Sequence, residues 1–176
     1  MRGGGFRYTT IDYAYLGVVA VVMGVVFYGT WYVYYFGKAI GGPIFARLIS
    51  YGLWFIGAPL GATLIKKPFS AFLGETLGAL IETIIPTVGG LTNLMYGVIQ
   101  GLLSELIYLV FGYRRFDYIT GALAGLAAAP GAIVLDAILF EDIATVEVMA
   151  LWLLAAMISG AIYGGLASIV AEYVRR

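Results

Sequence analysis

The chain has 176 residues, of which 62% are hydrophobic and 11% charged, and its mean hydropathy is +0.96. A soluble chain of this size could not bury so much apolar surface in one core. Ten basic and ten acidic side chains give a formal net charge of +0, which argues against a nucleic-acid-binding surface. The absence of cysteine and histidine excludes disulfides, thiol nucleophiles, Cys/His zinc sites and a histidine general base.

Six apolar stretches of membrane-spanning length follow one another along the chain. They cover residues 13–36, 44–65, 69–85, 91–111, 118–140 and 146–170, with short polar or Gly/Pro-containing connections between them. A helix needs about 20 apolar residues to cross a bilayer, and lipid cannot satisfy open backbone groups. We therefore predict an all-α membrane protein, a bundle of six transmembrane helices that forms one domain over residues 1–176.

Basic residues are distributed unequally between the two ends of these helices. With the N-terminus inside, the outer loops carry only Lys38 and Arg47. The inner segments carry Arg2, Arg7, Lys66, Lys67, Arg114, Arg115, Arg175 and Arg176. Because cytoplasmic loops are enriched in Lys and Arg, this bias predicts that both termini are cytoplasmic.

Four acidic side chains fall within the predicted helices, where charges are costly and usually face protein or water. Glu75 and Glu82 are seven residues apart and share one helix face. They either pair with basic loop residues or form a face that binds a cation or a hydrogen-bonding ligand. Asp136 either joins a pocket or reaches the membrane interface. Glu105 points away from the polar face of its helix, and we interpret it as structural or as facing another helix contact.

A row of polar side chains marks the helix predicted over residues 91–111. Asn93, Tyr96 and Gln100 recur at i, i+3 and i+7, which places two amides and a phenol on one face. The short connection before this helix lets Glu82 approach the row. The pattern indicates a pocket on the extracellular half of the membrane, or interhelical hydrogen bonds that only hold the bundle together.

Two tryptophans lie away from the interfacial belts that aromatic residues usually form. Trp54 falls near the middle of its predicted helix, where an indole either packs against helices or stacks on a flat ligand. Trp152 is a weaker candidate of the same kind. Most aromatic residues at positions 31–36 are interpreted as belt residues, with one or two able to cover a pocket.

Small residues form a smooth face on the first predicted helix, at Gly17, Ala20 and Gly24. Such faces allow close helix packing, either within the bundle or against another membrane subunit. We find no nucleotide-binding loop, nucleophile elbow or zincin motif, so no catalytic residue, metal site or cofactor is expected.

A resemblance to a known family extends from about residue 51 to residue 115. It is carried by YGLWFIGAPLGA (51–62), KKP (66–68), Glu75, Glu82, YGVIQGLLSE (96–105) and GYRR (112–115). These residues resemble the YkoE-type substrate-binding (S) components of energy-coupling factor (ECF) transporters. That family is associated with thiamine or its hydroxymethylpyrimidine (HMP) precursor, and some members carry a cobalt-transport label.

The resemblance implies a non-catalytic, vitamin-capturing subunit of a prokaryotic cell membrane. It would work with a transmembrane coupling protein and two cytoplasmic ATPases, which hydrolyse ATP. S components of this kind usually present an Ala-x-x-x-Ala face on their first helix to the coupling protein. The nearest match here is Ala20-x-x-x-Gly24, with Gly17 beside it.

Thiamine is an aromatic cation whose pyrimidine edge both donates and accepts hydrogen bonds. A buried carboxylate suits the cation, and the Asn93 and Gln100 amides suit the pyrimidine edge. Trp54 or Tyr96 could stack on a ring. Glu75, Glu82 and Asp136 complete the expected substrate-binding set.

Two other functions are considered. A self-sufficient secondary transporter or channel for a small cation would use Glu75, Glu82 and Glu105 as relay sites. An intramembrane enzyme would rely on carboxylates for acid–base chemistry, but the sequence offers no nucleophile or clear metal set.

Overall fold

The computed structural model describes residues 7–86 and 88–175, and within these ranges it contains helices and no strands. The elements are α1 (Thr10–Ser50), the 3-10 helix η1 (Tyr51–Phe55), α2 (Gly57–Ile65), α3 (Ser70–Ile84), α4 (Thr92–Val110), α5 (Tyr118–Leu139) and α6 (Val146–Arg175). The predicted all-α fold class is therefore confirmed. Among the described residues, four segments are long and apolar enough to cross a membrane: Thr10–Ile65, Thr92–Val110, Tyr118–Leu139 and Val146–Arg175.

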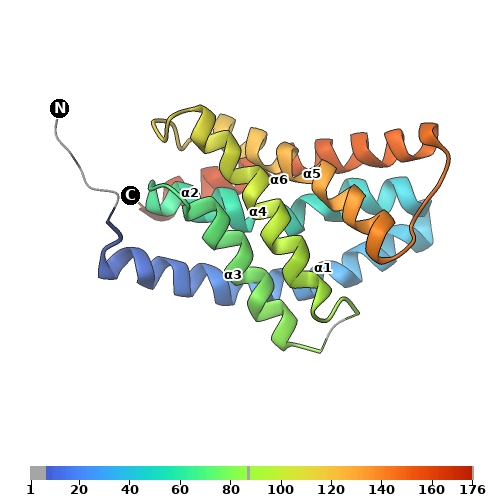
Figure 1. The fold of residues 1–176 in the computed structure, drawn as a ribbon, viewed down its shortest axis with the longest axis horizontal. Coiled ribbons are helices and arrows are strands. Elements are labelled where there is room, and N and C mark those ends of the chain that lie inside the picture. Colours follow the sequence, from blue (N-terminus) through green and yellow to red (C-terminus); the bar gives the residue numbers. More distant parts are fainter. Residues whose placement is uncertain (1–6, 87, 176) are drawn as a thin grey trace.

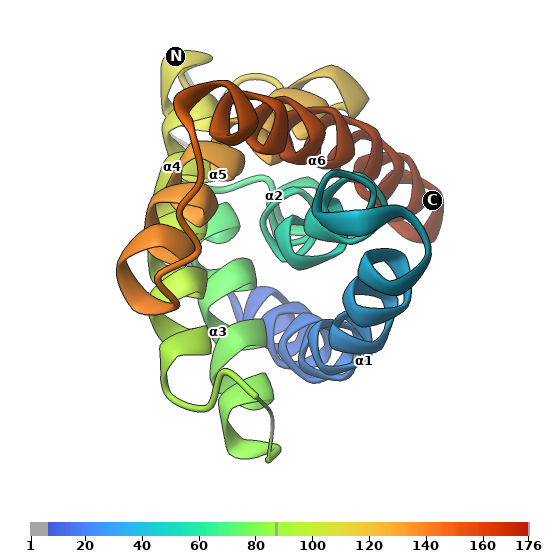
Figure 2. The ribbon, with the colours of Figure 1, turned by 90° about the vertical axis from the view of Figure 1, so that its right-hand side faces the viewer.

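The short helix α2 lies in the middle of the bundle, enclosed by the longer helices (Figure 2). It contacts α1, α3, α4, α5 and α6. The first and last described residues lie at one end of the molecule, and the α5–α6 connection lies at the other (Figure 1).

The expected break between the stretches 13–36 and 44–65 is present at Gly42, where two helices meet within α1, but residues 44–65 do not form one regular helix. Residues 44–50 continue α1 beyond a kink at Gly42, and η1 and α2 follow as separate elements. Gly42 has φ 72°, a left-handed conformation that favours glycine, and Pro43 supplies no backbone N–H for a regular helix. An apolar run predicts burial in lipid or protein, but it does not distinguish a straight helix from a broken one.

Helix α3 is also shorter than the apolar stretch that contains it. Its 15 residues extend about 22 Å, less than the hydrocarbon thickness of a bilayer of about 30 Å. The helix follows Phe69, which has a positive φ of 66°.

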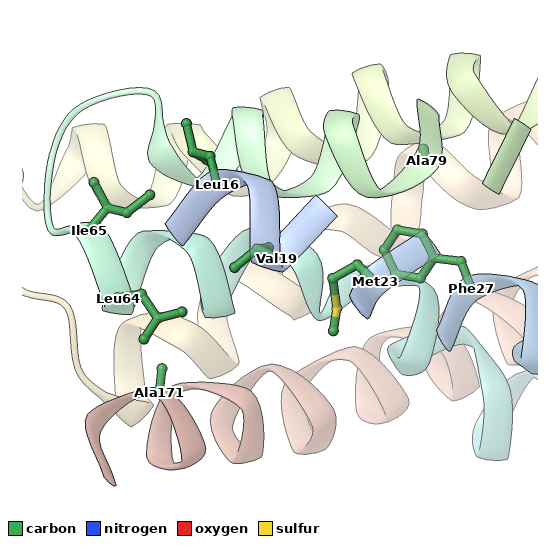
Figure 3. Close-up of a cluster of buried hydrophobic side chains, with 8 residues drawn as sticks. All are labelled: Leu16, Val19, Met23, Phe27, Leu64, Ile65, Ala79 and Ala171. Carbon is green, nitrogen blue, oxygen red and sulfur yellow. The ribbon is translucent and has the colours of Figure 1, made fainter. Parts of the chain in front are cut away.

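An apolar core joins α1, α2, α3 and α6 (Figure 3). It contains Leu16, Val19, Met23 and Phe27 of α1, Leu64 and Ile65 of α2, Ala79 of α3 and Ala171 of α6. These side chains interdigitate around α2, so the central helix is held by apolar contacts at its C-terminal end.

Glycines bring α5 and α6 into backbone contact. A Cβ atom added at Gly125 would lie 2.1 Å from the carbonyl oxygen of Gly160, and one added at Gly160 would lie 2.2 Å from the carbonyl oxygen of Gly125. Glycine is therefore required at both positions for this close approach.

The small-residue face of α1 divides between the interior and the surface. Ala20 and Gly24 are buried, and a Cβ added at Gly24 would lie 2.4 Å from Cγ2 of Ile81 on α3. Gly17 is exposed, with nothing from the described residues within 4 Å of an added Cβ. Internal packing against α3 thus accounts for Gly24 and leaves Gly17 on the outer surface.

Candidate functional site

A cavity of about 300 Å³ is lined in part by the α5–α6 connection, which lies at the end of the bundle away from the described chain ends (Figure 1). It is enclosed by α1, η1, α3, α4, α5 and the α5–α6 connection. All seven residues expected to bind a substrate lie on its wall: Trp54, Glu75, Glu82, Asn93, Tyr96, Gln100 and Asp136. Helical spacing and short connections therefore identified residues that converge in space. Their contacts show what each side chain can offer a ligand.

Glu75 connects the cavity to the central helix. Its side chain is 0% exposed, and Oε2 accepts a 2.8 Å hydrogen bond from the backbone N–H of Ala58 in the first turn of α2. The first N–H groups of a helix lack intrahelical partners and favour negative charge, so the carboxylate caps α2. The other oxygen, Oε1, has no hydrogen-bond partner among the described residues. It is free to accept a hydrogen bond from a ligand.

Glu82 lies two helical turns beyond Glu75 on the same face of α3 and is 3% exposed. Its Oε1 accepts a 2.9 Å hydrogen bond from the indole N–H of Trp31 on α1. No basic group within residues 7–86 and 88–175 forms an ion pair with Glu82. The carboxylate is held in place by a neutral donor and keeps its charge unpaired.

Aromatic rings form one side of the cavity. The ring of Trp54 lies 5.1 Å from Trp31, 6.1 Å from Tyr34 and 5.8 Å from Tyr51, measured between centroids. The indole N–H of Trp54 donates to the carbonyl oxygen of Phe27 at 3.1 Å, which fixes the plane of the ring. Trp31 and Tyr34 therefore line the cavity together with Trp54, although sequence position alone favoured a belt for most of that segment.

The Asp136 carboxylate, at the cavity wall, has three hydrogen-bonding or ion-pair partners among the described residues. It accepts hydrogen bonds from the hydroxyls of Tyr51 at 2.5 Å and Tyr96 at 2.8 Å. A guanidinium nitrogen of Arg47 lies 3.5 Å from its Oδ2 and also forms an ion pair with Asp142. Asp136 thus lines the cavity, but the contacts of its carboxylate are with other side chains of the protein.

The assignment of Arg47 to an outer loop is wrong. The residue is 0% exposed, and its guanidinium carbon lies 4.0 Å from the ring centroid of Trp152. It belongs to the segment of α1 beyond the kink at Gly42, which carries it into the bundle. A signal was present in the sequence, because Arg47 lies inside the apolar stretch 44–65.

The three polar residues on one face of α4, Asn93, Tyr96 and Gln100, differ in their contacts. Tyr96 donates to Asp136, and Asn93 is buried on the cavity wall. Gln100 is also buried, and its amide makes no hydrogen bond to any residue that the structure describes. The Gln100 amide can therefore both donate to and accept from a ligand.

Glu105 and Trp152 lie away from the cavity. Glu105 accepts hydrogen bonds from the backbone N–H groups of Phe69 at 2.6 Å and Phe72 at 3.0 Å, so it caps α3. Its structural interpretation is confirmed. Trp152 packs on Arg47, which explains its burial without a ligand.

Metal-binding groups do not gather at this cavity. Across residues 7–86 and 88–175, no cluster of three or more His, Cys, Asp or Glu side chains could hold a metal ion. The cavity instead combines carboxylates, amides and aromatic rings, which suits an organic molecule with donor groups or positive charge.

An apolar helical bundle around a small, acidic and aromatic cavity defines a membrane protein that handles a small molecule. The family model described as "ABC-type cobalt transport system, permease component" matches residues 11–131, and the chain belongs to this family. It is therefore a multi-pass transport protein of the cell membrane.

Two known proteins show how far this similarity extends. The chain is 28% identical over 154 residues to the "Putative HMP/thiamine permease protein YkoE" of Bacillus subtilis (strain 168), covering 85% of this chain and 77% of the relative. A solved structure described as "Crystal structure of an S-component of ECF transporter" matches with a TM-score of 0.86 at 24% identity. That match covers 96% of this chain and 86% of the other, and it shows a shared fold. The resemblance to YkoE-type S components is confirmed.

Proposed function

We propose that this chain is the substrate-binding S component of an ECF-type ABC importer, and that it captures thiamine or its HMP precursor. The observation that carries the proposal is the convergence in one cavity of aromatic rings, Glu75 Oε1, which has no hydrogen-bond partner among the described residues, and Glu82, which forms no ion pair with any of them. The name of the Bacillus subtilis relative, which mentions HMP and thiamine, supports the same substrate class. The chain itself is non-catalytic and needs no cofactor.

The cavity offers complementary groups to both parts of thiamine. Glu75 Oε1 and the Gln100 amide suit the pyrimidine edge, which donates and accepts hydrogen bonds. Glu82 supplies negative charge for a cationic ring, and Trp54 supplies an aromatic face. Asn93, Tyr96 and Asp136 complete the wall. A neutral HMP molecule would bind through Glu75 and Gln100 and would not need the negative charge of Glu82.

The chain in this proposal crosses the membrane six times, as one domain over residues 1–176, with both termini in the cytoplasm. Residues 44–65 make the second crossing as a broken segment. Lys67 lies at the same end of the molecule as Arg7 and Asp12, because its ammonium contacts the Arg7 carbonyl at 2.9 Å and Asp12 at 2.5 Å. Arg2 and Arg176, which contributed to this orientation, lie outside the described residues. The cavity then opens in the extracellular half.

Delivery of the substrate requires the coupling protein and two cytoplasmic ATPases. Of the three small residues proposed to contact the coupling protein, Gly17 is exposed, whereas Ala20 and Gly24 are buried. We therefore place the docking contact around Gly17. Replacing Gly17 with Leu should leave substrate binding by the isolated chain unchanged and reduce ATP-driven uptake by the complete transporter.

The direct test is a titration of the purified chain with thiamine and HMP, followed by tryptophan fluorescence. Saturable binding that is weakened at least tenfold in Glu82→Gln would support the proposal. A chain that binds neither compound, while remaining folded by circular dichroism, would rule out this substrate class.

A self-sufficient cation transporter using Glu75, Glu82 and Glu105 remains the alternative. It is weakened because both oxygens of Glu105 accept backbone N–H groups of α3, away from the cavity. Cation flux through liposomes containing this chain alone, abolished by Glu75→Gln and Glu82→Gln, would favour the alternative over the S component.

A further inference from the structure

The buried carboxylates around the cavity are of two kinds. Glu75 and Glu82 are held by neutral N–H donors and form no ion pair with any described residue. Asp136 and Asp142 both contact Arg47. All four acidic residues line the cavity, whereas Arg47 lies behind its wall.

Arg47 is fixed from several sides. Its guanidinium lies over the rings of Trp152 at 4.0 Å and Tyr51 at 5.4 Å, measured from Cζ to the centroids. The side chain is 0% exposed, so water does not screen its charge. The attraction of Asp136 for a cation in the cavity is therefore offset by a positive charge that the ligand does not touch.

The same cluster fixes the hydroxyl groups of two tyrosines. Tyr51 and Tyr96 each donate their single O–H proton to Asp136. A tyrosine whose proton is engaged in this way offers a ligand only its oxygen lone pairs. This part of the wall therefore accepts hydrogen bonds from the ligand, and Arg47 offsets one of its two carboxylate charges.

From these contacts we propose that Arg47 is a specificity-determining positioning residue. It offsets one of the two carboxylate charges of Asp136 and Asp142 from behind the wall, so that Glu75 and Glu82 are the buried carboxylates whose charge no described cation offsets. The inference rests on the proposed function and adds the division of charge within the site. Lys38 and Glu141 also line the cavity, but they are exposed at its rim and solvent weakens their effect.

The test compares two ligands that differ in charge. They are thiamine and an analogue in which an uncharged aromatic ring replaces the thiazolium. The cation preference is the Kd of the neutral analogue divided by the Kd of thiamine. It is measured for the unaltered chain, Arg47→Gln, Asp136→Asn and the double variant.

Opposite shifts are expected from the two single variants. Arg47→Gln should raise the cation preference by about three- to tenfold, because Asp136 is no longer offset, and Asp136→Asn should lower it by a similar factor. The double variant removes one charge of each sign and should return to the unaltered value. Glu82→Gln should lower the cation preference by about tenfold, and this decrease should not depend on Arg47.

A purely structural role for Arg47 would weaken both ligands equally and leave the cation preference constant. Removing one partner of a buried ion pair is destabilising, whereas replacing both is better tolerated. If Arg47→Gln does not fold, Asp136→Asn and the double variant still decide the question. An unchanged preference in Asp136→Asn, or no recovery in the double variant, would overturn the inference alone. Failure of the unaltered chain to bind either ligand would overturn the proposed function, and this inference with it.

Discussion

Glu75 of α3 accepts a 2.8 Å hydrogen bond from the backbone N–H of Ala58, in the first turn of α2. Glu105 of α4 makes the equivalent contact with α3, through the N–H groups of Phe69 and Phe72. Two buried glutamates thus cap the starts of two helices, and of the two only Glu75 also lines the cavity. Substitutions at Glu75 and Glu105 should therefore affect stability alike, whereas only a substitution at Glu75 should also affect binding.

We expect Glu75→Gln and Glu105→Gln each to lower the unfolding free energy by about 1 kcal/mol, because a neutral amide oxygen replaces a charged acceptor. Only Glu75→Gln should also weaken thiamine binding, since Glu75 lines the cavity and Glu105 does not. Thermal unfolding in detergent and a binding titration on the same samples would measure both effects. Equal loss of affinity in the two variants would contradict the distinct position of Glu75.

The three tryptophans should respond differently to a ligand. Trp31 and Trp54 line the cavity, whereas Trp152 packs on Arg47 outside it. We expect Trp152→Phe to retain the fluorescence quenching caused by thiamine. Trp54→Phe should lose a large part of the quenching and bind more weakly. Quenching that disappears in Trp152→Phe would place the ligand elsewhere.

The contact between α5 and α6 should not tolerate a side chain. Gly125→Ala places a Cβ 2.1 Å from a backbone oxygen of α6, which cannot move aside, so we expect a loss of about 3 kcal/mol. Gly17→Ala is the control, because nothing among the described residues lies within 4 Å of its added Cβ. Its melting temperature should stay the same or rise slightly, since Ala favours a helix over Gly. Similar losses in both variants would contradict this packing.

Asp117 gives a pH-dependent contribution to stability outside the membrane-spanning segments. Burial alone would raise its pKa, but hydrogen bonds from the Thr120 N–H and the Arg115 guanidinium lower the pKa overall. A folded-state pKa below the unfolded value means that the charged form stabilises the fold above about pH 4 and that this contribution is lost as the pH falls.

The corresponding variant is Asp117→Asn, which keeps an N-cap side chain but removes its charge. We expect it to be less stable than the unaltered chain by about 0.5 kcal/mol at neutral pH. This difference should disappear as the pH falls through the lowered pKa of Asp117 and the carboxylate is protonated. Unfolding curves measured across this pH range would show it. A difference that is independent of pH would indicate that charge has no role in the cap.

Local patterns were sufficient for much of the cavity. Glu75 and Glu82, seven residues apart, share a face on any regular helix, and so do Asn93, Tyr96 and Gln100. The connection between the two helices is too short to separate these faces widely. The polar residues were therefore predictable as a group, because each depends on helical period and on its neighbours in the chain.

The partners of each polar residue were not predictable in this way. Arg47 meets Asp136 and Asp142 across 89 and 95 positions of sequence, and no local pattern pairs residues so far apart. From the sequence, Ala20 and Gly24 could face either lipid or protein. In the structure both are buried, and Gly24 packs against α3.

Composition and periodicity by themselves determined that this chain is a helical membrane protein with carboxylates, amides and aromatic rings on inward faces. Lipid permits few backbone structures, and buried polar groups need partners, so these conclusions require no long-range information. The tertiary structure alone decided which carboxylates are paired and which remain available. An ion pair depends on contacts between distant segments, and only the packed bundle brings Arg47 to Asp136 while placing no cation from residues 7–86 and 88–175 beside Glu75 and Glu82.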